Sequence, residues 1–224
     1  MRDLEIRGAG NLLGSEQSGF IEMMGFETYT RILEEAVREL KQEEFQELFK
    51  DEQATPGGVR GFAVEADLEA FIPGLYVENE TERLTIYRRL YAVNTNEQLD
   101  EIGLELRDRF GKRPPQVDTL LGLVRLKLIA GTLGFAKIHL SPERLEAHYP
   151  PSSDTLFYES ARFQHLMTAF SRMRERGVKV SQGETTLKTI LPFGRKLEPE
   201  AVLERANVFI QELLKILPQP SPSG

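Results

Sequence analysis

Hydrophobic residues recur at helical spacing in six stretches of the chain, which predicts six amphipathic helices. These helices span residues 27–41, 82–93, 95–110, 114–134, 160–175 and 199–217, with Gly131 as an alternative end for the fourth. Thr95 and Gln98 form a capping-box pattern at the start of the third helix, and Gly111 stops it after Phe110. The helix over 82–93 is expected to bury Leu84, Tyr87, Leu90 and Tyr91 on one face.

Alternation of apolar and polar residues predicts short strands between these helices. The first runs from Phe62 to Ile72 and is ended by Pro73 and Gly74. Further strands are expected near residues 136–140, 144–149, 155–158, 178–181 and 186–191. Because strands and helices do not alternate regularly, the pattern indicates an α+β fold with a small, mostly antiparallel sheet, and not a doubly wound one.

The composition divides the chain into four parts. Residues 42–61 are polar and end in Thr-Pro-Gly-Gly, which is typical of an interdomain linker. Before it, residues 1–41 hold a glycine-rich loop and a helix. After it, residues 62–217 form the compact domain, and the tail over 218–224 is expected to be disordered.

Length and composition exclude several classes of protein. The chain has 224 residues, 40% of them hydrophobic and 28% charged, as in ordinary globular proteins. It contains no apolar run of about 18 residues, so we expect no membrane span. The absence of cysteine excludes disulfides, thiolate metal sites and cysteine nucleophiles, and is compatible with a cytoplasmic location.

Charge is unevenly distributed along the chain. Residues 1–112 hold 13 basic and 24 acidic residues, whereas residues 113–224 hold 15 basic and 11 acidic residues. Nucleic-acid binding depends on clustered basic charge, so the acidic half is better suited to a basic protein surface. In the other half, the cations Arg162, Arg172, Arg174, Arg176 and Lys179 leave open a direct contact with nucleic acid.

A dense glycine cluster near the N-terminus, Gly8, Gly10 and Gly14, lies between Arg7 and Gln17. Its spacing does not fit the dinucleotide fingerprint, and it lacks the Gly-Lys-Ser/Thr of a phosphate-binding loop. From the glycines alone, a turn between two helices remains the alternative to a functional loop.

The helix that ends at Phe110 carries an acidic stripe. Glu97, Glu101, Glu105 and Asp108 fall on one side, opposite an apolar face of Leu99, Ile102, Leu106 and Phe110. Leu104 lies inside the acidic stripe, where it would be exposed to water. Three interpretations are open: a solvated face, a carboxylate metal site, and a docking face with Leu104 at its centre.

The sequence contains no recognisable catalytic constellation. His139, His148 and His165 are far apart and lack metal-ligand spacing, the serines lack a nucleophile-elbow context, and ATP-binding motifs are absent. We therefore expect this chain by itself to be a binding or regulatory module without a cofactor.

A resemblance to a known family adds to these expectations. Residues 2–19, RDLEIRGAGNLLGSEQSG, closely resemble the motif that ends the motor of RecG-like DNA translocases, in the version of bacterial transcription-repair coupling factors. Three further segments resemble the C-terminal domain of the same family: Phe71-Ile72-Pro73, residues 83–89 and residues 104–111.

The resemblance implies that the chain is the C-terminal part of a longer parent protein. That parent would use ATP and Mg²⁺ to translocate on double-stranded DNA, displace stalled RNA polymerase and recruit UvrA for excision repair. Arg7 and Gln17, on the loop with Gly8, Gly10 and Gly14, would couple hydrolysis to movement.

The resemblance also implies a regulatory role for the C-terminal domain. In the family, this domain folds back on a UvrB-like N-terminal module and masks the surface that binds UvrA. Glu105 and Asp108 match the carboxylates of that contact, with Glu101 and Leu104 beside them on the same face.

Overall fold

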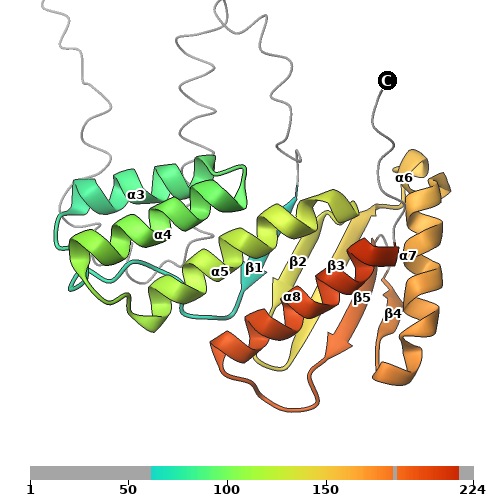
Figure 1. Ribbon diagram of the computed structural model, residues 1–224. Coiled ribbons are helices and arrows are strands. Elements are labelled where there is room, and N and C mark those ends of the chain that lie inside the picture. Colours follow the sequence, from blue (N-terminus) through green and yellow to red (C-terminus); the bar gives the residue numbers. More distant parts are fainter. Residues whose placement is uncertain (1–61, 184–185, 217–224) are drawn as a thin grey trace, which may run out of the picture.

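The computed structural model describes residues 62–183 and 186–216 of the chain. These residues form a helical hairpin and a five-stranded sheet, joined by a long helix that packs on the sheet (Figure 1). The expected helix over 27–41, the linker over 42–61, the glycine motif and the tail over 218–224 lie outside the described residues.

The sheet is mostly antiparallel, as predicted. Its strands are β1 Ala63–Ala66, β2 Lys137–Leu140, β3 Arg144–Pro151, β4 Lys179–Gln182 and β5 Thr186–Pro192. They lie in the order β1-β2-β3-β5-β4, and β1 alone among them pairs with its neighbour in the parallel direction. The α+β fold class is therefore confirmed.

Most of the predicted helices are present with bounds close to those expected. They are α3 Glu80–Ala92, α4 Asn96–Phe110, α5 Pro115–Ala130, α7 Ala161–Arg172 and α8 Pro199–Ile216, with 3-10 turns at Gly131–Leu133 and Arg174–Arg176. A further short helix, α6 Thr155–Glu159, was not predicted. Both predicted ends of α4 are confirmed. The Thr95 hydroxyl accepts a hydrogen bond from the Gln98 N–H at 3.3 Å, and Gly111 follows the helix with a φ of 83°.

Helices α5 and α8 pack on one face of the sheet (Figure 1). Leu145, Ala147 and Tyr149 of β3 are buried, and Tyr149 packs against Phe157 of α6 and Phe163 of α7. Helices α5 and α8 approach closely at Gly122, where a Cβ atom would lie 2.5 Å from Cδ1 of Leu203. Burial of this apolar face stabilises the domain.

Two predicted strands are wrong in extent or type. The first strand ends at Ala66 and not at Ile72, because its neighbour β2 ends at Leu140. The last hydrogen bond between the two strands runs from the Asp67 N–H to the Leu140 carbonyl oxygen. Residues 155–158 belong to helix α6, because the Asp154 carboxylate caps the Phe157 N–H at 3.1 Å.

One predicted core position in α3 is also wrong. Tyr91 is 40% exposed, while Ile86 is buried beside Tyr87 and Leu90. Leu84 is partly buried against the core. The helical period allowed either choice, and packing against the rest of the domain selects the face.

Candidate docking site on helix α4

Helix α4 presents two opposite faces, as the sequence predicts. Leu99, Ile102 and Leu106 are buried, and Phe110 is partly buried. Leu104 is 56% exposed on the outer side. A large aliphatic side chain in water is unfavourable unless a partner covers it, so this position is a candidate anchor for docking.

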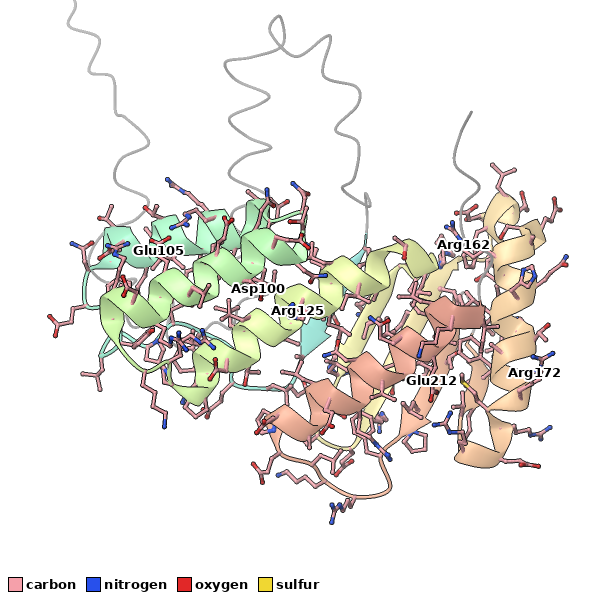
Figure 2. All side chains as sticks on the ribbon, in the orientation of Figure 1. Asp100, Glu105, Arg125, Arg162, Arg172 and Glu212 are labelled. Atoms are coloured by element: carbon pink, nitrogen blue, oxygen red, sulfur yellow. The ribbon has the colours of Figure 1, made fainter. Side chains whose placement is uncertain are left out.

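Glu105 binds arginines within the domain. Its carboxylate accepts two hydrogen bonds from Arg89 of α3, at 2.7 and 2.9 Å, and one from Arg109 at 3.0 Å. Arg109 also pairs with Glu82 of α3 and lies 4.9 Å from the ring centroid of Phe110. Glu105, which is labelled in Figure 2, therefore ties α4 to α3.

The electrostatics of this cluster follow from its hydrogen bonds. The bidentate bond from Arg89, with help from Arg109, lowers the pKa of Glu105 from 4.5 to about 2. The same bond raises the pKa of Arg89 above its ordinary value. All three charges therefore persist at neutral pH and reinforce the hairpin.

Glu101 and Asp108 differ from Glu105. Both are exposed, and neither forms an ion pair with any residue that the structure describes. Asp108 follows Leu104 by four positions and Glu101 precedes it by three, so both flank Leu104 on the helix surface. The predicted docking face therefore contains two free carboxylates around Leu104 and a third, Glu105, that is already engaged.

A shallow groove of about 460 Å³ runs between α4 and α5 on the other side of Leu104. Gly103 of α4 and Gly122 of α5 are among the residues that line it, together with Leu121. Figure 2 shows Asp100 of α4 and Arg125 of α5 facing each other across this groove, where they form an ion pair. Arg113 closes one end and donates a 2.6 Å hydrogen bond to the Gly103 carbonyl oxygen.

The sequence did not predict the arginines of this site. Arg109 could have been found, because it lies four residues after Glu105, a spacing that pairs opposite charges on a helix. Arg89 lies sixteen residues from Glu105, and Arg125 lies twenty-five residues from Asp100. No local signal connects them, and only the packing of α3, α4 and α5 brings them together.

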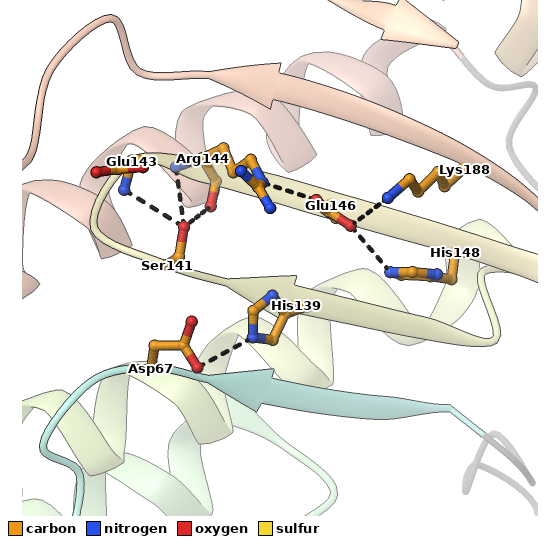
Figure 3. Close-up of polar contacts among 8 residues, drawn as sticks. All are labelled: Asp67, His139, Ser141, Glu143, Arg144, Glu146, His148 and Lys188. Carbon is orange, nitrogen blue, oxygen red and sulfur yellow. Dashed lines mark hydrogen bonds and ion pairs between the residues drawn. The ribbon is translucent and has the colours of Figure 1, made fainter. Parts of the chain in front are cut away.

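A second polar cluster lies on the face of the sheet away from α5 and α8 (Figure 3). Glu146 is buried there and accepts hydrogen bonds from Arg144 at 2.7 Å and Lys188 at 2.9 Å. Burial alone would raise the pKa of Glu146, but these bonds bring it below its ordinary value. The charges satisfy one another, which fits a structural role.

The three histidines are not brought together. His139 pairs with Asp67 at 3.2 Å, His148 lies 3.5 Å from Glu146, and His165 bonds the carbonyl oxygen of Ala161. Burial, with Lys137 nearby, lowers the pKa of His148. Among the described residues, no group of histidines and carboxylates is arranged to hold a metal ion, and no helix is long and apolar enough to cross a membrane.

The basic run at the end of α7 is largely unpaired. Arg176 forms an ion pair with Glu212 of α8 at 2.7 Å. Arg162, Arg172, Arg174 and Lys179 form none with the described residues. Figure 2 shows Arg162 and Arg172 along α7, far from Glu105.

The Glu105 cluster gives a testable pH dependence. A lowered pKa in the folded state means that the carboxylate stabilises the domain above pH 4.5, and that this contribution is lost as the pH falls toward 2. We expect Glu105→Gln to lower the free energy of unfolding by about 1 kcal/mol at pH 7, as measured by urea unfolding. The difference from the unsubstituted chain should shrink steadily below pH 4.5.

Glu101→Gln provides the matched control, because Glu101 has no cationic partner among the described residues. We expect this substitution to change the free energy of unfolding by less than about 0.5 kcal/mol at both pH 7 and pH 3. A deficit of Glu105→Gln that stays constant from pH 7 to pH 3 would show that the ion pairs do not contribute.

The described residues thus form a small α+β domain with a candidate docking face on one helix. Residues 66–160, which include both helices of the hairpin, match the TRCF domain family. This match lies on the segment that carries Leu104 and its flanking carboxylates.

Particular relatives share this similarity. The chain is 34% identical to the transcription-repair-coupling factor of Staphylococcus haemolyticus over 213 residues, which cover 92% of the chain and 18% of that protein. It is 38% identical to the Staphylococcus aureus factor over 148 residues, or 66% of the chain and 12% of that protein. The chain thus spans less than a fifth of the length of these relatives.

The fold is shared with a solved structure. The crystal structure of the C-terminal domain of a transcription-repair coupling factor matches with a TM-score of 0.54 and 18% identity, over 70% of this chain and 93% of that one. Residues 66–160 thus match the TRCF domain, and the chain is similar to the C-terminal part of transcription-repair-coupling factors, which confirms the resemblance seen in the sequence.

Proposed function

We propose that this chain is the regulatory C-terminal part of a coupling factor and acts as an autoinhibitory latch. Helix α4 would dock on the UvrB-like module of the same protein and mask the surface that binds UvrA. The observation that carries this proposal is Leu104, exposed between two carboxylates, Glu101 and Asp108, that have no cationic partner among the described residues.

The size and chemistry of this face suit a reversible contact. A single apolar anchor with charged residues around it is typical of modest interfaces. A latch that is closed about 99% of the time needs only about 2.7 kcal/mol, so a few such contacts suffice. Binding of UvrA would then be weakened in proportion to the closed fraction, and engagement of the parent with RNA polymerase would relieve it.

The activity of the parent protein is part of the same proposal. It would be an ATP-dependent translocase on double-stranded DNA that displaces stalled RNA polymerase in the cytoplasm. Arg7 and Gln17, with Gly8, Gly10 and Gly14, would belong to the translocation motif, while ATP and Mg²⁺ would bind elsewhere in the parent. The names of the relatives support a role in transcription-coupled repair.

A second candidate function is direct contact with nucleic acid through α7. It is favoured by Arg162, Arg172, Arg174 and Lys179, whose charges are not neutralised by the described residues. Cations near the C-terminal end of a helix also interact favourably with its dipole, so this run has a structural explanation as well. Contact with nucleic acid is therefore the weaker of the two candidate functions.

Reversal of the two free carboxylates tests the latch. In the full-length parent, we expect Glu101→Lys with Asp108→Lys to raise the apparent affinity for UvrA about tenfold, because each reversal replaces attraction to a basic surface with repulsion, about 0.5–1 kcal/mol per site. Titration of UvrA at two salt concentrations measures the effect, which should weaken at high salt.

Two further variants control this experiment. Leu104→Ala should act in the same direction through lost apolar burial, without the salt dependence. Glu175→Lys with Glu204→Lys makes the same change in net charge at exposed positions away from α4 and should leave UvrA binding unchanged. Normal UvrA binding by both the Glu101/Asp108 and the Leu104 variants would contradict the latch.

A further inference from the structure

We infer that the partner surface of α4 carries charges of both signs: an apolar side chain packs on Leu104, a cation faces Glu101 and Asp108, and a carboxylate faces Arg107 across the groove between α4 and α5. This inference rests on the proposed latch and adds a specificity element to it. It concerns the side of Leu104 that faces the groove between α4 and α5, away from the acidic stripe.

The two sides of Leu104 differ in charge. Glu101 and Asp108 lie toward α3, whereas Arg107 lines the groove toward α5. Residues three or four apart are neighbours on a helix, so Arg107 is about one turn from Leu104. A partner that covers Leu104 therefore also meets Arg107.

Arg107 is a cation without a local counter-charge. Arg113 pairs with Asp118 at 2.7 Å and Arg125 pairs with Asp100, so the other arginines that line the groove are neutralised. Arg107 is exposed and pairs with none of the carboxylates that the structure describes. The groove thus has one uncompensated positive charge at its edge.

The shape of the groove favours a protein segment as its occupant. Leu104 is exposed at its edge and Leu121, which is partly buried, lies along it, so both can offer apolar contacts to a partner. A side chain of the partner that sits in this groove would lose water on one side. A carboxylate about one helical turn further along the partner would then reach Arg107. The two-sign pattern also fixes orientation, because a partner rotated by 180° would place like charges together.

Reversal of Arg107 separates this inference from a simple acidic contact. If α4 met an entirely basic surface, Arg107→Glu would tighten the latch and lower UvrA binding by the full-length parent. We expect the opposite, a threefold to tenfold increase in UvrA affinity, because the bond to a partner carboxylate becomes a repulsion. Arg88→Glu is the matched control, since Arg88 is also exposed and unpaired among the described residues but lies on α3.

A charge exchange at adjacent positions gives a second test. Arg107→Asp combined with Asp108→Arg keeps the net charge and moves each sign to the other side of Leu104. We expect UvrA affinity to rise at least as much as in Arg107→Glu. Unchanged affinity in the exchange variant, or lower affinity in Arg107→Glu, would overturn the inference while the Leu104→Ala result still supports the latch.

Two other results would also overturn it. If Glu101→Lys/Asp108→Lys and Leu104→Ala leave UvrA binding unchanged, the latch itself fails and the inference falls with it. If sedimentation shows that the 224-residue chain forms a dimer that Leu104→Ala abolishes, the groove is occupied by a second copy of the chain. Circular dichroism melts of each variant establish that altered binding does not arise from unfolding.

Discussion

Replacement of Tyr149 by alanine is expected to lower the free energy of unfolding by about 3–5 kcal/mol, as for other large buried aromatics. Tyr149 is 1% exposed at the centre of an aromatic cluster. Its ring centroid lies 5.4 Å from that of Phe135, 6.0 Å from Phe157 and 5.8 Å from Phe163. Its loss would leave a cavity between the sheet and helices α6 and α7, and urea unfolding followed by circular dichroism measures the cost.

The hydroxyl of Tyr149 can be separated from its ring. It lies 2.8 Å from Oγ1 of Thr189, and both residues are buried. Tyr149→Phe should cost about 1–2 kcal/mol because the Thr189 hydroxyl loses its partner. Adding Thr189→Val should recover much of that loss, since no buried polar atom then remains unpaired. Equal costs for Tyr149→Ala and Tyr149→Phe would show that the ring contributes nothing beyond the hydroxyl.

Gly134→Ala is expected to lower the free energy of unfolding by about 2–4 kcal/mol, through backbone strain and overpacking together. Gly134 has a φ of 84° and a ψ of 16°, in the left-handed region that alanine disfavours. A Cβ atom there would also lie 2.8 Å from Cε2 of Phe157, inside the same aromatic cluster. Thermal and urea unfolding measure the effect.

Gly177 is a matched control for Gly134. Its φ of 85° and ψ of 4° are nearly the same, but a Cβ atom would meet Pro192 at an ordinary distance of 3.4 Å. Gly177→Ala should therefore cost only the backbone term, about 1–2 kcal/mol. If the two variants lose equal stability, the contact with Phe157 does not contribute, and the aromatic cluster is looser than its geometry indicates.

Tyr149 and Gly134 both lie away from the candidate docking face on α4. The hairpin of α3 and α4 is held by its own contacts, among them the Tyr76 hydroxyl, which donates to the Leu106 carbonyl oxygen at 2.8 Å, and the bond from Arg113 to Gly103. Leu104 therefore projects from a rigid helix and not from a loop. A rigid site suits a latch, because little conformational entropy is lost each time it closes.

The sequence by itself determined the helices whose signals are local. Thr95, Gln98 and Gly111 set the ends of α4, and its period of apolar residues separated the buried Leu99, Ile102 and Leu106 from the exposed Leu104. These predictions held because capping and helical periodicity depend on residues within a few positions of each other. The family resemblance came from the same kind of information, short ordered motifs, and the match over residues 66–160 confirms it.

Only the tertiary structure decided the features that depend on distant partners. The extent of β1 was limited by the length of β2, more than seventy residues later, and the aromatic segment over 155–158 became helix α6 beside Tyr149. In the candidate site, the sequence placed Glu101, Glu105 and Asp108 in one stripe as equals. The fold distinguishes them, because α3 brings Arg89 to Glu105, whereas no described element brings a cation to the other two. A charge pattern on one helix shows which residues share a face, but what each charge is free to bind depends on the neighbours that packing supplies.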